Sequence, residues 1–585
     1  MQRSFKVVFQ PDGKRGNFSE GTNLLEAARS LGVDINSICG GAGACGKCIV
    51  KINTGSVPSP SETDKRFIDE KNLKNGFRLA CLHTIQTDLL VLVPKESRTG
   101  TQRLQTEGLE TGVKVAPFVS KRLDGDTVEI LYDGKVVRRV DSPEARILGF
   151  AVDIGSTKLA GYLMDLETGD LLSKASAMNP QIPYGEDIIS RIAAAIQTQG
   201  NNRMLHETLV RGIKELLGEA CRNAKEHIED IYDIVLVGNT AMQHFLLGIN
   251  PEPLSRSPFT PDNLMHRDLP PETLDLSPYA SVHVLPLIAG FVGADCVAAT
   301  LATGIDKAEQ IGFLMDIGTN TEIIVGNKER MVACSCASGP AFEGAHIRCG
   351  MRAASGAIEG VWIDKETLEP RIKVIDGTEP LGICGSGLIY LLSEMLKTGI
   401  IDSSGRLIER DHPRLKKRAG IREFIVSWKN ENGSDENISI TQKDIRELQK
   451  GKAAIFSGSQ IAINHMGLEP RSIEQIYIAG AFGTYINRES ALNIGMIPEF
   501  KLLDIQQVGN AAGTGARMAL LSRNARLEAQ KIRDRVEYIE LASLLEYNQA
   551  YIDALQLPHH DLSLFPETVK RLEESGWVKG RLHTT

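Results

Sequence analysis

Four cysteines near the N-terminus have the types and spacing of metal or iron–sulfur ligands. Cys39, Cys45 and Cys48 follow a C-x5-C-x2-C pattern, and Cys81 comes after 32 further residues. Four thiolates suit a [2Fe–2S] cluster, and the small residues between Cys39 and Cys48 let the backbone wrap around it and direct N–H groups at its sulfurs. An all-thiolate zinc site is the alternative. We interpret the pattern as a [2Fe–2S] site.

Six further cysteines form no C-x2-C pair, so we expect buried small side chains and no second cluster. They are Cys221, Cys296, Cys334, Cys336, Cys349 and Cys384.

A second kind of chemistry is indicated by two similar segments much further along the chain. Residues 149–164 read GFAVDIGSTKLAGYLM and residues 312–326 read GFLMDIGTNTEIIVG, each an apolar strand, a D-I-G turn and another strand. Such turns bring backbone N–H groups and hydroxyls to phosphate oxygens, and there is no G-x-x-x-x-G-K-[ST] motif to do so instead. We expect Asp153 and Asp316 to hold Mg²⁺ through its waters, and Glu322 to orient an attacking water. The predicted phosphate contacts are Gly155, Ser156, Thr157, Lys158, Gly318, Thr319, Asn320 and Thr321.

A third segment, residues 476–483, is an apolar strand that ends in a glycine-rich turn. The predicted adenosine contacts in this turn are Gly480, Ala481, Phe482 and Gly483. A single D-x-G-x-T turn is weak evidence, and all three segments could be ordinary hairpins. Together they resemble the phosphate 1, phosphate 2 and adenosine motifs of the superfamily that joins acetate and sugar kinases, heat-shock chaperone ATPases and actin. The resemblance implies a two-lobed ATPase that binds ATP and Mg²⁺.

The elements that must position these groups divide the chain into four parts. Residues 1–95 contain short strands, one helical segment at 22–31 and the cysteine loop. In the C-x5-C-x2-C spacing and the Arg-Leu-Ala-Cys segment ending at Cys81, they resemble adrenodoxin-type ferredoxins, which implies a β-grasp domain. Residues 96–112 are polar and contain glycines, so we expect a flexible linker that lets the cluster domain move. Residues 113–147 form a small middle region, and residues 148–585 hold the two related ATPase lobes. The fold class is therefore multidomain α+β and α/β.

Further blocks within residues 148–520 narrow the resemblance to the reductive activators of corrinoid-dependent enzymes. These blocks are residues 238–242, 337–345, 350–353, 384–388 and 508–513. The resemblance implies an ATP-hydrolysing oxidoreductase that resets inactive cob(II)alamin to cob(I)alamin. It also implies a methyltransferase-associated corrinoid protein as partner and an upstream electron donor; a homodimer is considered as well. An N-terminal [2Fe–2S] domain is the version found in activators from acetogen-type anaerobic bacteria.

The resemblance also implies a reason for using ATP, because the reduction potential of the Co(II)/Co(I) couple in a bound corrinoid is well below that of an ordinary iron–sulfur cluster. Plant-type clusters have potentials near roughly −400 mV. If the potential of the cobalt couple is roughly 200 mV below that of the cluster, the equilibrium constant for transfer of one electron is unfavourable by about three decades, or ~4–5 kcal/mol. ATP can overcome this energy difference only if the nucleotide states of the protein bind the states of the partner with different affinities.

Three other functions are considered from the sequence. The chain could be a small-acid or sugar kinase with an appended ferredoxin domain, an activator of a radical-type dehydratase, or a nucleotide-gated chaperone for corrinoid loading. The dehydratase activators need cysteines close to the ATPase, and no suitable set stands there. Arg348 and Arg352 are candidates for phosphate or partner contacts, whereas His244 and His346 are more typical of structural histidines.

The bulk composition is that of a globular protein of several domains. The chain has 585 residues, of which 42% are hydrophobic and 24% charged, with a net charge of −8. This acidic balance argues against nucleic acid as the partner. The most apolar stretch, residues 282–304, contains Pro286, Asp295 and several glycines, so we expect no membrane span. Ten cysteines without a secretory signal favour a cytoplasmic protein.

Overall fold

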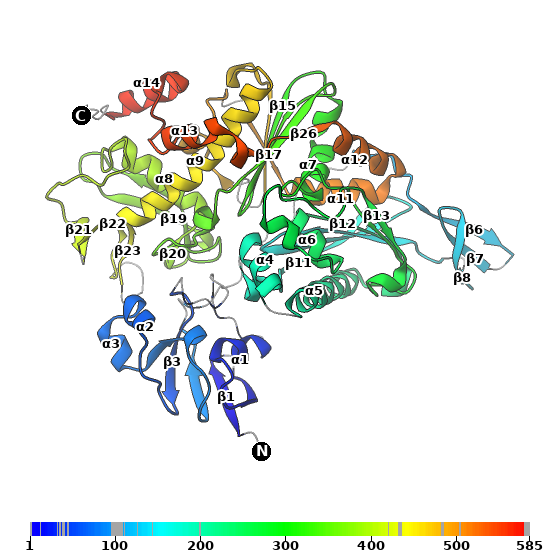
Figure 1. The fold of residues 1–585 in the computed structure, drawn as a ribbon, viewed down its shortest axis with the longest axis horizontal. Coiled ribbons are helices and arrows are strands. Elements are labelled where there is room, and N and C mark those ends of the chain that lie inside the picture. The colour runs from blue at the N-terminus through cyan, green and yellow to red at the C-terminus, as the bar shows by residue number, and fades with distance from the viewer. Residues whose placement is uncertain are drawn as a thin grey trace.

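The structure is a computed structural model in which a small N-terminal domain lies beside a much larger two-lobed body (Figure 1). It describes residues 3–577 apart from a set of short segments. These are residues 12, 32, 34, 36, 38–40, 42, 44–45, 95–96, 98–108, 110–111, 126, 143, 186, 198–199, 419, 431–435, 481–484 and 502–504. Within the described part, no helix is both long and apolar enough to cross a membrane.

The N-terminal domain is a five-stranded mixed sheet in the order β2-β1-β5-β3-β4. The strands are β1 (Ser4–Gln10), β2 (Lys14–Ser19), β3 (Ile49–Thr54), β4 (Phe77–Leu79) and β5 (Leu89–Leu92), and the helices are α1 (Leu24–Ser30), α2 (Glu62–Phe67) and α3 (Glu70–Lys74). The helix expected at 22–31 is α1, and its N-cap is Asn23, whose side chain accepts from the amides of Leu25 and Glu26. One apolar core joins α1 to the sheet. This arrangement matches the predicted β-grasp domain.

A three-stranded antiparallel sheet follows and projects from the body at the edge opposite the C-terminus (Figure 1). Its strands are β6 (Val119–Asp124), β7 (Thr127–Tyr132) and β8 (Lys135–Val140). The guanidinium of Arg523 lies over the ring of Phe118, 4.5 Å from its centroid, and so attaches this sheet to the body. Most of the linker expected at 96–112 lies outside the described residues. At its described end, the carbonyl of Leu109 accepts a 2.9 Å hydrogen bond from Arg517 of the body.

The first lobe is a six-stranded sheet in the order β11-β10-β9-β12-β14-β13. Its elements are β9 (Leu148–Ile154), β10 (Lys158–Asp165), β11 (Leu171–Met178), α4 (Ile188–Gln197), α5 (Asn201–Ala224), β12 (Ile231–Gly238), α6 (Thr240–Leu246), β13 (Arg267–Leu269), β14 (Ser281–Val284) and α7 (Ala294–Thr303). Helix α5 packs on β10 and β11 through an apolar face. The strands β9 and β12 are buried along almost their whole length, as expected for parallel neighbours covered on both faces.

The second lobe repeats this design with a sheet in the order β25-β24-β15-β16-β17-β26. Its sheet strands are β15 (Gly312–Ile317), β16 (Thr321–Gly326), β17 (Met331–Cys336), β24 (Gln475–Ala479), β25 (Ile505–Gly509) and β26 (Val536–Tyr538). Two smaller sheets contain β18 (Ala357–Ile363), β19 (Pro370–Val374), β20 (Gly382–Ile383), β21 (Leu415–Arg418), β22 (Ile421–Ser427) and β23 (Ile438–Thr441). The helices that follow β20 are α8 (Gly385–Lys397), α9 (Gln442–His465), α10 (Arg488–Asn493), α11 (Ala511–Leu521), α12 (Arg523–Arg535), α13 (Leu545–Asp553) and α14 (Pro566–Ser575).

The internal repeat seen in the sequence is a structural repeat. In each lobe an antiparallel hairpin, β9–β10 or β15–β16, carries the D-I-G turn, and its first strand pairs in parallel with a strand from later in the chain, β12 or β24. Helices α7 and α11 pack against each other and belong to one apolar cluster that contains residues of both sheets. The two turns are thereby held on one shared core.

Candidate functional site

The two D-I-G turns line one cavity of about 240 Å³, to which both lobes contribute. Eleven of the predicted residues lie in its wall: Asp153, Gly155, Ser156, Thr157, Lys158, Asp316, Gly318, Thr319, Asn320, Glu322 and Gly480. One turn from each lobe thus contributes to the wall of a single cavity, and the binding of ATP there stays a prediction. Ala481, Phe482 and Gly483 lie outside the described residues, so their predicted adenosine contacts remain predictions.

Thr321 is a predicted phosphate contact that the structure places elsewhere. It is fully buried, its hydroxyl lies 3.0 Å from that of Ser338, and it is not in the cavity wall. The reason is the alternation of side chains along a strand: Thr321 begins β16, and its neighbour Glu322 points into the cavity. The structure therefore brings Glu322 into the cavity wall but not Thr321, whose phosphate contact stays a prediction.

The turn of the first lobe is fixed by hydrogen bonds from neighbouring elements. A side chain at Gly155 would place its Cβ 2.8 Å from the carbonyl oxygen of Lys158, so glycine is needed there. Asn179 donates a 2.8 Å bond to the carbonyl of Gly155. Asn239 caps α6 and donates a 2.9 Å bond to Oγ of Ser156. The turn is therefore preorganised, with its hydroxyl held in place.

Two aspartates face each other across the cavity without enough positive charge to balance them. Burial and the charge of Asp153 together raise the pKa of Asp316 to about 7, against the opposing effect of Lys158. Burial likewise raises the pKa of Asp153, although Asn510 and Lys158 oppose this. Burial lowers the pKa of Lys158 despite the nearby carboxylates. An excess of buried carboxyls at a phosphate-sized cavity is the donor set that a hydrated Mg²⁺ requires.

Asp295 is a site residue that the sequence reasoning missed. It lies in the first turn of α7 and lines the cavity, where burial, Asp316 and Asp153 raise its pKa to about 7. Burial also raises the pKa of Glu322 well above its usual value, helped by Asp295 and Asp316. Its Oε1 accepts a 3.2 Å bond from the Ser335 hydroxyl, which orients the carboxyl toward the cavity. In sequence, Asp295 stood in an apolar stretch and carried no motif.

Several other wall residues come from the sequence blocks that carry the resemblance to the corrinoid activators. Glu343 accepts a 2.5 Å bond from the Thr319 hydroxyl and a 3.4 Å bond from the Thr157 hydroxyl, so one carboxylate touches both phosphate turns. Arg352 also lies in the wall, whereas Arg348 does not and instead pairs with Glu423 at 2.5 Å. Additional wall residues are Ile188, Asn239, Ile317, Phe342, Ala353, Cys384, Gly385, Ser386, Tyr485, Asn510 and Ala512.

His244 is structural, as the sequence suggested. It is buried, its Nδ1 lies 2.8 Å from the carbonyl of Thr240, and its Nε2 accepts from the amide of Asp262. Burial lowers its pKa, so the neutral ring is favoured.

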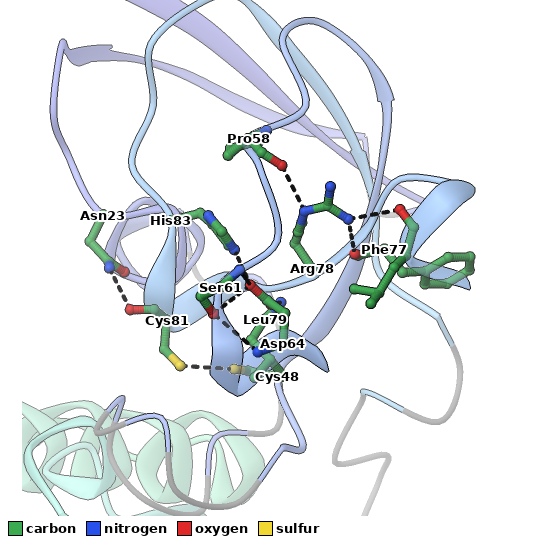
Figure 2. Close-up of polar contacts among 11 residues, drawn as sticks. Asn23, Cys48, Pro58, Ser61, Asp64, Phe77, Arg78, Leu79, Cys81 and His83 are labelled. Atoms are coloured by element: carbon green, nitrogen blue, oxygen red, sulfur yellow. Dashed lines mark hydrogen bonds and ion pairs between the residues drawn. The ribbon is translucent and has the colours of Figure 1, made fainter. Parts of the chain in front are cut away.

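Two of the four predicted cluster ligands lie within the described residues. Cys48 and Cys81 are buried, and their Sγ atoms lie 3.3 Å apart (Figure 2). Two thiolate ligands of one tetrahedral metal with 2.3 Å bonds lie roughly 3.8 Å apart, so this pair is close to the spacing needed to share one iron. Cys39 and Cys45 lie outside the described residues. Their role as ligands stays a prediction.

A buried hydrogen-bond network holds the chain around Cys81 in place (Figure 2). Asn23 donates a 2.8 Å bond to the carbonyl of Cys81. Asp64 accepts from the amide of Leu79 at 2.8 Å and lies 2.7 Å from Nε2 of His83. Burial favours the protonated form of Asp64, but these bonds and those from Ser61 outweigh it and lower its pKa. The ligand segment is therefore anchored on both sides of Cys81.

The remaining six cysteines are free; Cys349 is half-buried and the others are buried, as expected. Across the part of the chain that the structure describes, no group of three or more His, Cys, Asp or Glu side chains is arranged to hold a metal ion directly.

Comparisons with known proteins match three successive parts of the chain. A model of the 2Fe-2S iron-sulfur cluster binding domain matches residues 9–86, a model of the RACo middle region matches residues 148–308, and a model of the C-terminal, ASKHA domain of RACo matches residues 310–569. The corrinoid activation enzyme RamQ of Eubacterium limosum is 31% identical over 94% of this chain and 98% of its own length. The chain belongs to the RACo family. Because the first of these models spans all four predicted cysteine ligands, the family favours the cluster over zinc.

Two further relatives of the RACo family are similar over large parts of the chain. The [Co(II) methylated amine-specific corrinoid protein] reductase of Methanosarcina barkeri is 25% identical over 69% of this chain and 76% of its own length. A solved structure described as the reductive activator for corrinoid, iron-sulfur protein superposes with a TM-score of 0.71 and 32% identity, covering 96% of this chain and all of that one. The predicted fold class and family are confirmed.

Proposed function

We propose that this RACo family member uses ATP to drive one electron from its [2Fe–2S] cluster to the cobalt of a corrinoid protein, reducing Co(II) to Co(I). The single observation that carries the proposal is that Asp153 and Asp316, from separate halves of the chain, line one cavity in a protein that also contains the cluster domain. Similarity to a corrinoid activation enzyme over nearly the whole chain supports the same substrate class.

The cavity residues would act on ATP as follows. The two D-I-G turns donate N–H and hydroxyl groups to the phosphates, and Lys158 adds a positive charge. Asp153, Asp316 and Asp295 hold Mg²⁺ through its waters. The ion, when bound, neutralises charge on the phosphates. Glu322 orients the attacking water, and its raised pKa allows it to hold a proton at that position.

The cluster residues would act on the electron. Cys39, Cys45, Cys48 and Cys81 hold the cluster, which supplies one-electron transfer when bound. Asn23 and Asp64 keep the Cys81 segment in place. We further propose an upstream electron donor, a methyltransferase-associated corrinoid protein as acceptor, a cytoplasmic setting and a homodimer.

One pair of measurements separates this function from a kinase. Purified protein is given Mg-ATP with and without a Co(II) corrinoid protein, and the released phosphate and the Co(I) absorption are both followed. Free inorganic phosphate together with Co(I) supports the proposal. Transfer of the phosphoryl group to a small acid or sugar, with no Co(I), would support the kinase.

A further inference from the structure

The cluster domain touches the ATPase body through the residue next to a cluster ligand. Nζ of Lys47 donates hydrogen bonds to the carbonyl oxygens of Ile347 and Arg348, each at 3.2 Å. Lys47 is followed directly by Cys48, which is buried beside Cys81. A movement of these two carbonyls would therefore change the contact made by the residue directly before the ligand Cys48.

The two carbonyls lie at the tip of a loop, residues 344–351, whose ends both lie in the nucleotide cavity. Phe342 and Glu343 precede the 344–351 loop and Arg352 and Ala353 follow it, and all four are wall residues. The tip is oriented by the backbone N–H of Arg348, which donates a 2.9 Å bond to Oδ1 of Asp444. One short segment thus connects the wall of the cavity with the contact to the cluster domain.

The 344–351 loop is too tightly closed to absorb a movement at its ends. A Cβ on Gly344, which has φ +82°, would lie 2.6 Å from the backbone nitrogen of Met351, and a Cβ on Gly350 would lie 2.2 Å from the carbonyl oxygen of Gly344. The amide of Met351 donates a 3.0 Å bond to the carbonyl of Ile383, and the amide of Ile383 donates a 2.8 Å bond back to the carbonyl of Cys349. Close-packed backbone of this kind shifts as a unit.

Glu343 accepts hydrogen bonds from two hydroxyls that are predicted to bind phosphate. Its carboxylate accepts from the hydroxyls of Thr319 and Thr157, the donors that the two turns offer to phosphate oxygens. A triphosphate bound to the same two hydroxyls would bring its negative charge next to this carboxylate, and like charges repel each other. The Arg352 guanidinium, on the other side of the loop, is attracted to the phosphates instead.

We propose that nucleotide binding releases the cluster domain from the body. The phosphates displace the Glu343 carboxylate and attract the Arg352 guanidinium, and the 344–351 loop moves with these two residues. This movement weakens the hydrogen bonds from Lys47 to the loop. The proposal rests on the proposed function for the identity of the nucleotide site. It adds the route by which that site acts on the cluster. Because linkage is reciprocal, a chain that lacks the Lys47 contact binds nucleotide more tightly, since no contact has to be given up.

The test compares nucleotide affinities of full-length, cluster-loaded variants by calorimetry with the non-hydrolysable analogue AMPPNP and Mg²⁺. Lys47→Met removes the charge and the donors, and Lys47→Arg restores both. Lys71→Met removes a charge from an exposed helix of the same domain and is the matched control. We expect Kd to fall at least about 5-fold in Lys47→Met, and to stay at the wild-type value in the other two.

A second measurement needs no variant at all. In wild-type protein, AMPPNP is expected to raise deuterium uptake in peptides covering residues 346–349 and in the strand after Cys48. If wild type binds AMPPNP but Lys47→Met has the same or a higher Kd, or if AMPPNP leaves both peptides unchanged, the release mechanism is wrong while the proposed function stands. If wild type does not bind AMPPNP, both are wrong.

Discussion

Nδ2 of Asn510 donates a 2.8 Å hydrogen bond to Oδ2 of Asp153. Asn510 follows β25 of the second sheet and caps α11, while Asp153 belongs to β9 of the first. The opposite atom of the same amide, Oδ1, accepts a 2.7 Å bond from the amide of Gly513, so the orientation of the side chain is fixed from both ends. Two lobes that are distant in sequence are thereby joined at the predicted metal site.

This bond can be removed without removing the helix cap. In Asn510→Ser the hydroxyl still caps α11, but Asp153 loses its donor. Bonds to charged groups contribute about 1.5–3 kcal/mol, so we expect ATP hydrolysis to fall roughly 10-fold or more while the melting temperature changes little. Asn487→Ser is the control, because Asn487 caps α10 and bonds Tyr390 outside the cavity. Equal hydrolysis in both variants would show that the Asp153 bond has no catalytic role.

The acidic pair itself is expected to be essential for hydrolysis. Asp153→Asn and Asp316→Asn keep the shape of each side chain but remove the charge that holds Mg²⁺. We expect each to lower the ATPase rate by at least about 100-fold, with the visible absorption of the cluster unchanged. Asp170→Asn, on the exposed edge of the same lobe, should behave as wild type. Hydrolysis at the wild-type rate in either cavity variant would mean that these turns do not form the ATP site.

The same cavity predicts an unusual dependence of stability on pH. The pKa of Asp316 is raised from 3.8 to about 7 in the folded protein. A carboxyl with a raised pKa stabilises the fold fully only below its unfolded pKa, and this contribution is lost as the pH rises through about 7. In the absence of Mg²⁺ and nucleotide, Asp316→Asn should therefore melt at a higher temperature than wild type at pH 8. The difference should be smaller at pH 5. A difference that does not depend on pH would contradict the raised pKa.

The cluster assignment predicts a definite metal content. Protein purified without oxygen should contain about two irons and two sulfides per chain, and Cys48→Ser or Cys81→Ser should lose the cluster spectrum because both thiolates are ligands. Cys221→Ala, in the core of the first lobe, is the control and should retain it. Zinc in place of iron in the wild-type protein would overturn the assignment.

The sequence predicted those parts of the fold and the site that are encoded by local patterns. The cysteine spacing and the repeated D-I-G turns identified the cluster domain and the cavity, because short apolar strands and glycine turns determine their own structure. Thr321 lies outside the cavity wall although it was expected beside the phosphates, because the exact residue at which a strand begins decides which face a side chain takes.

Other site residues could not be predicted, because they act through contacts that only the folded chain creates. Asp295 lies in an apolar stretch, and only the packing of α7 brings it into the cavity wall. Glu343 and Asn510 were part of recognised sequence blocks, yet their partners, Thr319 and Asp153, belong to other elements. The bonds from Lys47 to the 344–351 loop join residues about 300 positions apart, for which one sequence gives no signal.

The central claim is that ATP drives an electron from this protein to a corrinoid, and the formation of cob(I)alamin tests it most directly. Pre-reduced protein is mixed anaerobically with a Co(II) corrinoid protein, and the cob(I)alamin absorption is followed with Mg-ATP, with Mg-AMPPNP and without nucleotide. We predict rapid formation of Co(I) with Mg-ATP. Without nucleotide, the expected yield of Co(I) is lower by about three decades if the potential of the cobalt couple is roughly 200 mV below that of the cluster. Co(I) formation at the same rate without nucleotide, or none with Mg-ATP, would contradict the account.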